Sequence, residues 1–270
     1  MAKIIIITDL DGTLLHPKTY SFEAATAALN MIKEKEIPLV LCSSKTRAEI
    51  EVYRKRLNNK HPFISENGGG IFIPMDYFRF EIAGEVRDNY IAITLGKPYS
   101  EIRNAFIEIR KRLKIKAKGF GDFSAEDVAA LARLPLSEAM LAKARDFDEP
   151  FIFEEGENRI EEFLDAIEDA GLHWTQGRFY HIMGDNDKGK AVKILKGFYE
   201  KEHGKITTIG LGDRFNDLPL LNEMDYPVLV KNEDSSYDER ISLPNLIKAE
   251  GIGPEGWNEV ILELCQRLIK

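Results

Sequence analysis

Short apolar runs alternate with helix-like stretches over the first 65 residues, and this rhythm restricts the fold more than any other feature of the chain. Lys3–Thr8 and residues 38–42 are rich in Ile, Leu and Val, as strands are when both faces of a parallel sheet are covered. Residues 22–32 between them carry apolar side chains at helical spacing, and Phe63–Ser65 provides a third strand candidate. This order predicts an α/β fold with a Rossmann-like, doubly wound parallel sheet.

The rhythm is interrupted in the middle of the chain and then resumes. Residues 84–183 mix strand and helix patterns, including an amphipathic helix over 159–170 and a hairpin whose two strands are separated by Gly177. A helix and a buried strand follow again after Asp187. The pattern predicts a core made of residues 1–83 and 184–270, with an α+β cap domain of residues 84–183 inserted into it.

Charge and cysteine content exclude several classes of protein. The 37 Lys and Arg against 45 Asp and Glu give a formal charge of −8, which argues against a nucleic-acid partner. Cys42 and Cys265 are far apart in sequence, so they form neither a disulfide framework nor a metal cluster. No apolar run reaches the ~18–20 residues of a membrane span, and the N-terminus lacks a signal-peptide pattern. We therefore expect a cytoplasmic monomer or weak homodimer without a membrane partner.

Acidic residues follow two of the predicted strands. Asp9 and Asp11 end the first strand, and Asp213 ends a late strand, with Asn216 and Asp217 just beyond it. Because the carboxyl ends of parallel strands meet at one edge of the sheet, these carboxylates would crowd together and repel each other. Taken alone, Asp9 could equally be a turn cap. Taken together, the oxygen groups predict a divalent cation, and Mg²⁺ is the hard cation they suit.

These residues resemble the motifs of the haloacid-dehalogenase-like (HAD) phosphotransferases. The segment 9–15 resembles the first motif, D-x-D-G-T followed by apolar residues; Ser43 resembles the second, Lys188 the third, and 212–217 the fourth, G-D-x-x-N-D. All four occur in the family's order. Glu66–Gly68 further resembles the Cof-like, type IIB subgroup, whose cap is inserted between the second and third motifs.

The resemblance implies a mechanism with defined roles. Asp9 would be the nucleophile that forms an aspartyl phosphate, and Asp11 would protonate the leaving oxygen and then activate water. Ser43 and Lys188 would hold the transferring phosphoryl oxygens.

The cofactor implied is Mg²⁺, and its ligands come from the same motifs. The resemblance assigns it to Asp9, the backbone carbonyl of Asp11 and Asp213. Asn216 and Asp217 would support these ligands or add another.

Further stretches resemble the mannosyl-3-phosphoglycerate phosphatase family. Residues 43–46 read Ser-Ser-Lys-Thr where most capped relatives have a triplet like T-G-R. Other similar stretches are 145–151, 177–181, 211–221 and 253–257. The resemblance implies hydrolysis of mannosyl-3-phosphoglycerate to mannosylglycerate, a compatible solute, and phosphate. The scarcity of Gln, found only at positions 176 and 266, together with abundant Lys, Glu and Ile, is typical of a thermophile.

Such a sugar phosphate would need cations for its carboxylate and hydrogen-bonding groups for its hexose. Arg145 or Arg178 could bind the carboxylate. Glu149, His181 and Tyr180 could bind the hexose. Each of these is otherwise a solvated surface residue. The candidate substrate-binding residues are Ser44, Lys45, Asn67, Arg145, Glu149, Arg178 and His181.

Two alternatives remain open at this point. Within the same fold, the enzyme could be a phosphatase for another sugar phosphate or a phosphohexomutase, which the four motifs do not distinguish. A non-catalytic sugar-phosphate-binding module is a different class, and loss of Asp9 or Asp11 would be expected of it, but both are present.

Overall fold

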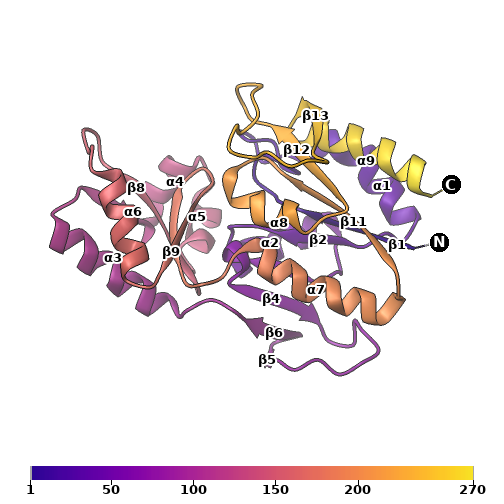
Figure 1. Cartoon of the computed structure of the whole chain (residues 1–270), viewed down its shortest axis with the longest axis horizontal. Helices are drawn as coiled ribbons and strands as arrows, with labels where there is room; N and C mark the ends of the chain where they lie inside the picture. The colour runs from indigo at the N-terminus through magenta and orange to yellow at the C-terminus, as the bar shows by residue number, and fades with distance from the viewer. Residues whose placement is uncertain (1, 270) are drawn as a thin grey trace.

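Lys3–Thr8 forms the central strand, β1, of the large sheet in the computed structural model, which describes residues 2–269 (Figure 1). Within these residues the sheet has nine strands in the order β13-β12-β11-β1-β2-β3-β4-β6-β5. The strands from β13 to β3 run parallel to each other. Their bounds are β2 Leu39–Cys42, β3 Phe63–Ser65, β11 Ile206–Gly212, β12 Tyr226–Lys231 and β13 Ile247–Ile252.

Alternate side chains of β1 pack into two different layers. Ile4 and Ile6 pack with the helices α1, α2 and α9, whereas Ile5 and Ile7 pack with α7 and α8 on the opposite face. Helices therefore cover both faces, and the predicted doubly wound α/β core is confirmed. The helix bounds are α1 Thr26–Glu34, α2 Arg47–Leu57, α7 Lys188–His203, α8 Leu218–Asn222 and α9 Pro254–Leu268.

Three antiparallel strands extend the sheet beyond β3. They are β4 Gly70–Pro74, β5 Glu85–Arg87 and β6 Tyr90–Thr94. The sequence prediction assigned residues 84–94 to the insertion, but β6 pairs with β4 in the large sheet, with Ile93 opposite Ile71. An alternating strand pattern has the same form in either sheet, so periodicity could not decide between them. We propose that the boundary lies between Thr94 and Tyr99.

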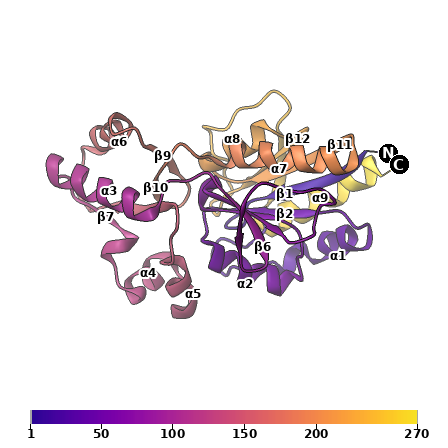
Figure 2. The same cartoon turned by 90° about the horizontal axis from the view of Figure 1, so that it is seen from below.

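The inserted part is a separate layer of strands and helices beside the core (Figure 2). Within the described residues its sheet has four antiparallel strands in the order β7-β8-β10-β9, with the bounds Ala117–Gly119, Asp148–Phe153, Tyr180–Met183 and His173–Gln176. Helices α3 Tyr99–Leu113 and α6 Ile160–Asp169 share an apolar cluster with this sheet. Helices α4 Ala125–Ala132 and α5 Leu136–Ala142 pack together, and α5 contacts α2 of the core. The predicted β9–β10 hairpin is confirmed.

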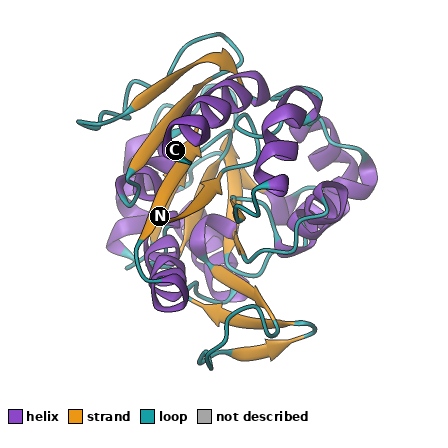
Figure 3. Cartoon of the chain, turned by 90° about the vertical axis from the view of Figure 1, so that its right-hand side faces the viewer, coloured by secondary structure: helices purple, strands orange, loops and turns teal. Residues whose placement is uncertain are grey.

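Both described ends of the chain lie together on the side of the core away from the cap (Figures 1 and 3). The carboxyl ends of β1, β2 and β11 point the other way, toward the cap. Among residues 2–269, no helix has the length and apolar character needed to span a bilayer.

Candidate active site

A cavity lies where the carboxyl ends of the core strands face the cap, and both parts line it. From the core come Asp9, Asp11 and Asp213, and from the cap come Arg178 and His181. Ligands in open α/β sheets bind at this edge. The other lining residues are Tyr20, Ser44, Lys45, Glu49, Phe120, Ala132, Leu134, Ala142, Arg145, Pro150, Gly177, Phe179, Arg214 and Asn216.

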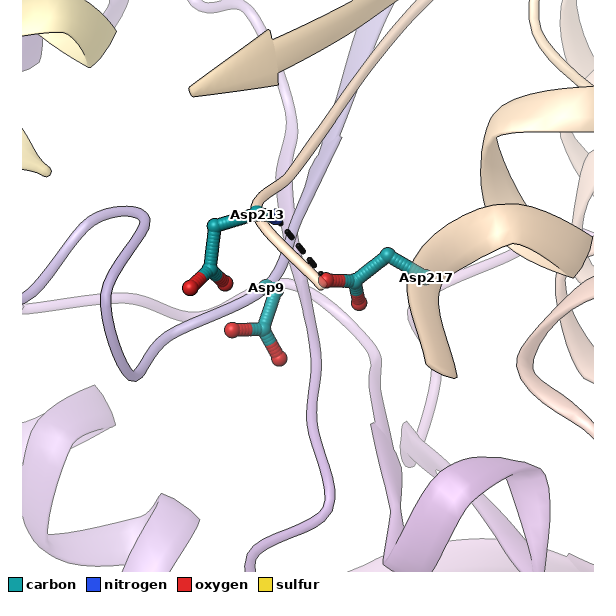
Figure 4. Close-up of side chains that lie close together, drawn as sticks. All are labelled: Asp9, Asp213 and Asp217. Carbon is teal, nitrogen blue, oxygen red and sulfur yellow. Dashed lines mark hydrogen bonds between the residues drawn. The ribbon is translucent and has the colours of Figure 1, made fainter. Parts of the chain in front are cut away.

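Three buried carboxylates meet at the core side of this cavity (Figure 4). Asp9, Asp213 and Asp217 each offer an oxygen within 4.8 Å of the others. Lys188, at the start of α7, is fully buried, and its Nζ lies 2.6 Å from Oδ1 of Asp9 and 2.6 Å from Oδ1 of Asp217. Lys188 thus faces two of the acids, and Nε of Arg214 lies 3.6 Å from Oδ2 of the third, Asp213. Two cations against three acids leave an excess of negative charge.

Asp217 uses both of its carboxylate oxygens within the protein. Oδ1 accepts from Lys188, and Oδ2 accepts from the backbone N–H of Asp213 at 3.0 Å and of Arg214 at 3.1 Å (Figure 4). These bonds fold the turn Phe215–Asp217 back onto the end of β11. Asp217 therefore orients Asp213 and Lys188 rather than offering a free oxygen.

Glycine is required where the turn after β1 approaches Asp213. Gly12 has φ +85°, and a Cβ there would lie 2.4 Å from Oδ2 of Asp213. Next to it, the hydroxyl of Thr13 donates to Oδ1 of Asp213 at 3.0 Å. In the D-x-D-G-T motif, the glycine thus allows the turn to approach Asp213 closely, and the threonine donates a hydrogen bond to it.

Burial and mutual repulsion destabilise the ionised forms of Asp9 and Asp213, and this raises their pKa values. Burial raises the pKa of Asp9 to about 7, with Lys188 opposing and the charge of Asp217 adding to the rise. Burial, then Asp217 and Asp9, raise the pKa of Asp213 well above its ordinary range. Burial lowers the pKa of Lys188, but Asp217 and Asp9 outweigh it and raise that pKa overall. Carboxylate oxygens held this way fit a hard divalent cation such as Mg²⁺.

Lys45 connects Asp11 to the core beneath the cavity. Its Nζ lies 2.9 Å from Oδ2 of Asp11 and 3.3 Å from Oε1 of Glu49, at the first turn of α2. A capping box of Thr46 and Glu49 fixes that turn. Ser43, fully buried at the end of β2, accepts from the backbone N–H of Lys45 at 3.3 Å.

Two arginines of the cap line the cavity, and they differ in whether a carboxylate pairs with them. Arg145 forms an ion pair with Asp148 and donates to the backbone carbonyl of Ser44 at 2.9 Å, so it joins the cap to the core. Arg178 donates to three neutral oxygens: the hydroxyl of Tyr20 at 3.0 Å and two carbonyls of residues 131 and 132. The hydrogen bonds that the structure gives to Arg178 thus leave its charge without a carboxylate partner.

Of the remaining predicted residues, Asn216 lines the cavity, whereas Asn67 and Glu149 do not. Asn216 lines the cavity and donates from Nδ2 to Oδ1 of Asn67, which lies buried behind it. Glu149 is fully buried and does not line the cavity. Its carboxylate accepts from Tyr99, Arg103 and the backbone N–H of Gly121. On a strand, neighbouring side chains point to opposite faces, and Glu149 is on the face turned away.

Sequence reasoning missed several residues at this junction. Tyr20 has φ +55° in the loop after the first motif, and its hydroxyl donates to the carbonyl of Ala132 in the cap at 2.7 Å. Glu66 is buried and accepts from the backbone N–H groups of residues 146–148 where the cap strand β8 begins. The family resemblance at residues 66–68 was the sequence signal for Glu66. No sequence signal pointed to Tyr20.

The comparisons with known proteins agree on one family. The sequence model of haloacid dehalogenase-like hydrolases matches residues 6–82. A glucosyl-3-phosphoglycerate/mannosyl-3-phosphoglycerate phosphatase from Methanococcoides burtonii is 51% identical, covering 97% of each chain. A mannosyl-3-phosphoglycerate phosphatase from Pyrococcus furiosus is 37% identical over 84% of this chain and 90% of its own.

Solved structures share the fold at much lower identity. A structure from Thermoplasma acidophilum superposes with a TM-score of 0.70 at 15% identity, covering 97% of this chain and 98% of its own. The sucrose-phosphatase of Synechocystis, in complex with sucrose and phosphate, gives a TM-score of 0.64 at 13% identity, covering 100% and 99%. At such identities the likeness establishes the architecture of core and cap, and the site has to be argued from this chain's own residues.

Proposed function

The chain belongs to the haloacid dehalogenase-like hydrolases and, within them, to the family of glucosyl-3-phosphoglycerate/mannosyl-3-phosphoglycerate phosphatases, and on this premise we propose that it hydrolyses the phosphate monoester of both glycosyl-3-phosphoglycerates. The observation that carries the substrate is the 51% identity over 97% of each chain. The products are the glycosylglycerate and inorganic phosphate. This extends the sequence expectation, which named the mannosyl compound alone.

In the first step the carboxylate of Asp9 attacks phosphorus. Lys188 holds Oδ1 of Asp9, and the hydrogen bonds of the described residues leave Oδ2 without a donor, at a position that lines the cavity. The Oδ2–phosphorus bond forms while the bond from phosphorus to the glycerate oxygen breaks. Asp11, protonated for this step, gives its proton to that leaving oxygen.

In the second step water replaces the aspartyl oxygen on phosphorus. Asp11, now ionised, takes the proton of the water as its oxygen bonds to phosphorus, and the bond to Asp9 breaks. Asp9 is regenerated as a carboxylate and phosphate leaves. Lys188 and Ser43 bind phosphoryl oxygens in both steps, which places charge and hydrogen bonds where negative charge accumulates.

We assign the Mg²⁺ that the family implies to the carboxylates of Asp9 and Asp213 and to the backbone carbonyl of Asp11, while Oδ2 of Asp9 remains for the attack on phosphorus. When bound, it supplies positive charge that offsets the excess of carboxylates and the substrate's phosphate. Asp217 supports this set by fixing the turn of Asp213, and Asn216 lies at its edge. The raised pKa of Asp9, to about 7, fits a site built to receive a cation.

The cations of the cavity fit a doubly anionic substrate. Arg178 lacks a carboxylate partner among its hydrogen bonds, and three of its five N–H groups are bonded, so the other two are available to the glycerate carboxylate. Lys45 lies next to Asp11 and adds charge near the phosphate. His181 and Asn216 offer hydrogen-bonding groups to the hexose.

A phosphate-release panel tests the proposal. It compares glucosyl-3-phosphoglycerate and mannosyl-3-phosphoglycerate with hexose 6-phosphates, sucrose 6-phosphate and p-nitrophenyl phosphate, each with and without Mg²⁺, using Asp9→Asn as the blank. We expect the highest kcat/KM for the two glycosyl-3-phosphoglycerates. A higher value for another sugar phosphate, or a requirement for a sugar bisphosphate, contradicts the proposal and favours another phosphatase or a mutase.

A further inference from the structure

Asp148, at the start of β8, lies at the centre of a buried hydrogen-bond network between the cap and the core. Its side chain is fully buried, and its backbone N–H donates to the core carboxylate of Glu66 at 3.0 Å. Asp148 lies within the stretch 145–151 that carries the family resemblance, but the sequence alone gives it no role. The mechanism above does not use it, although a buried carboxylate is costly unless its surroundings require it.

Three donors converge on the carboxylate of Asp148. Arg145 pairs with Oδ1, while Oδ2 accepts from Nδ2 of Asn67 at 3.1 Å and lies 2.8 Å from Nδ1 of His181. An ionised carboxylate can accept all three bonds, but a neutral amide cannot, because its NH₂ group would face a donor. The arrangement therefore requires a carboxylate at this position.

The contact with Asp148 decides which nitrogen of His181 carries the proton. Burial, and then the charges of Arg145 and Lys188, lower the pKa of His181 to about 3, so the ring is neutral. A neutral ring has one N–H, and the carboxylate of Asp148 takes it at Nδ1. Nε2 then carries a lone pair. His181 lines the cavity, and the hydrogen bonds found over residues 2–269 give Nε2 no partner.

The same carboxylate is connected to the acidic site through two amides. Nδ2 of Asn67 donates to Asp148, and Oδ1 of Asn67 accepts from Nδ2 of Asn216 at 3.1 Å. Asn216 belongs to the turn Phe215–Asp217, which also carries Asp217. The direction of each bond is fixed by the next, so the network leads from the cap wall of the cavity to the turn beside the carboxylates.

We propose that Asp148 is a positioning residue for sugar recognition: it holds His181 as an acceptor at Nε2 for a hexose hydroxyl and joins this acceptor, through Asn67, to the turn of Asn216. The ligand chemistry at Nε2 is a neutral hydroxyl donor, distinct from the anionic groups that Arg178 and Lys45 attract. The inference rests on the proposed function for the identity of the hexose substrate, but the geometry at His181 does not depend on it.

The first test is spectroscopic and needs no substrate. The ¹⁵N signals of the imidazoles are recorded at pH 7, and His181 is assigned by the pair that disappears in His181→Gln. We expect a protonated Nδ1 and an unprotonated Nε2 in the wild type, and a shift toward the Nε2–H form in Asp148→Asn. An Nε2–H or doubly protonated His181 in the wild type overturns the proposal.

The second test compares a substrate that has a hexose with one that lacks it. Asp148→Asn should lower kcat/KM for mannosyl-3-phosphoglycerate by about 10- to 100-fold, mainly through KM, because an Nε2–H would face the hydroxyl and leave a buried donor unsatisfied. Its kcat/KM for p-nitrophenyl phosphate should change by less than about 3-fold, because that ester places no hydroxyl at Nε2. Equal losses of kcat/KM on both substrates would show that Asp148 has only a structural role and would overturn the proposal.

Two further variants keep the test decisive. Asp122→Asn is the matched control, since Asp122 is a cap carboxylate paired with Arg103 and Arg110 outside the cavity lining. It should change neither substrate's kinetics. If Asp148→Asn does not fold, His181→Gln must show the same hexose-selective loss. If the wild type releases no phosphate from either glycosyl-3-phosphoglycerate, the proposed function fails, and the imidazole spectrum still decides the position of the proton.

Discussion

The Nζ atom of Lys45 lies 2.9 Å from Oδ2 of Asp11, the residue to which we assign the proton transfers. The lysine side chain is 4% exposed and the aspartate side chain 36% exposed, so the pair reaches from the buried core to the open cavity. Lys45 also contacts Glu49 at 3.3 Å, and the Tyr20 ring lies 5.1 Å from its charge. An entering anionic substrate therefore meets a lysine that is held in place by the core.

Lys45→Met should lower kcat/KM for mannosyl-3-phosphoglycerate by about 10- to 100-fold, because it removes a charge near the anionic groups and leaves Asp11 and Glu49 unpaired. Steady-state phosphate release measures the loss. The matched control is Lys190→Met, which removes an exposed lysine paired with Asp185 and should change kcat/KM by less than about 2-fold. Wild-type kinetics in Lys45→Met would contradict the role of this pair.

Asp9→Asn should abolish turnover, by about 10³-fold or more, because an amide cannot form the aspartyl phosphate. The melting temperature should stay the same or rise. The pKa of Asp9 is raised to about 7 by burial, with Lys188 opposing, so a neutral group of the same shape relieves repulsion with Asp217 and Asp213. Turnover above this level in Asp9→Asn would rule out the nucleophile assignment.

Chelation with EDTA should inactivate the enzyme, and added Mg²⁺ should restore it. Mg²⁺ should also stabilise the fold, by about 2.7 kcal/mol at a hundredfold excess over its Kd, which thermal unfolding measures without substrate. Asp213→Asn should remove most of this stabilisation because it replaces a carboxylate that we assign to the metal with a neutral amide. Activity and melting temperature that ignore both EDTA and Mg²⁺ would refute the metal site.

His61 should make the fold less stable at acid pH. Burial, and then the charges of Arg54 and Lys3, lower its pKa from the ordinary 6.5 to about 4, and its Nδ1 lies 2.7 Å from the hydroxyl of Tyr77. Between these pH values the unfolded chain binds the proton and the folded chain does not. The His61 contribution is thus complete above pH 6.5 and is lost as the pH falls toward 4.

Urea unfolding of wild type and His61→Gln between pH 4 and 7 isolates this contribution. The difference in free energy of unfolding between the two proteins should shrink as the pH falls. His173→Gln, at a half-exposed histidine, is the control and should leave the pH dependence as in the wild type. A constant difference between wild type and His61→Gln across this range would contradict the assignment.

Gly68→Ala should destabilise the fold far more than Gly171→Ala, although both glycines have positive φ. At Gly68, with φ +90°, a Cβ would lie 2.1 Å from the backbone oxygen of Asp187, whereas at Gly171, with φ +69°, nothing lies within 4 Å. Gly171→Ala should cost about 1–2 kcal/mol for its conformation alone, and Gly68→Ala about 3 kcal/mol or more. Chemical denaturation measures both, and equal costs would contradict the crowding at Asp187.

The parts of the fold that depend on local pattern were predictable from the sequence. The apolar run of β1 and the capping box of Thr46 and Glu49 are encoded in neighbouring residues, and both are present. Helix α5 differs: it begins at Leu136 after Pro135 and has no side-chain cap, although Ser137 follows directly. Pro135 occupies the N-cap position with φ −56° and ψ 146°, and its ring has no acceptor for the N–H groups of the first turn.

The candidate site divides in the same way. The positions of Asp9 and Asp213 follow from their place at strand ends, which any parallel sheet brings together. Glu149 and Asp148 are neighbours on β8, and the pairing of β8 with β10 places Asp148, but not Glu149, beside His181 of the cavity wall. The residue pattern does not reveal which strand pairs with β8. The sequence therefore suggested Glu149 as a hexose contact and gave no role to Asp148.

The position of β1 has a consequence for synthesis on the ribosome. One edge of β1 pairs with β2, which follows soon after, but the other edge pairs with β11, whose first residue is Ile206. At the usual ~5–20 residues per second, translation of residues 9–205 takes about 10–40 s. Throughout this time the nascent sheet has an unpaired, apolar edge at its centre.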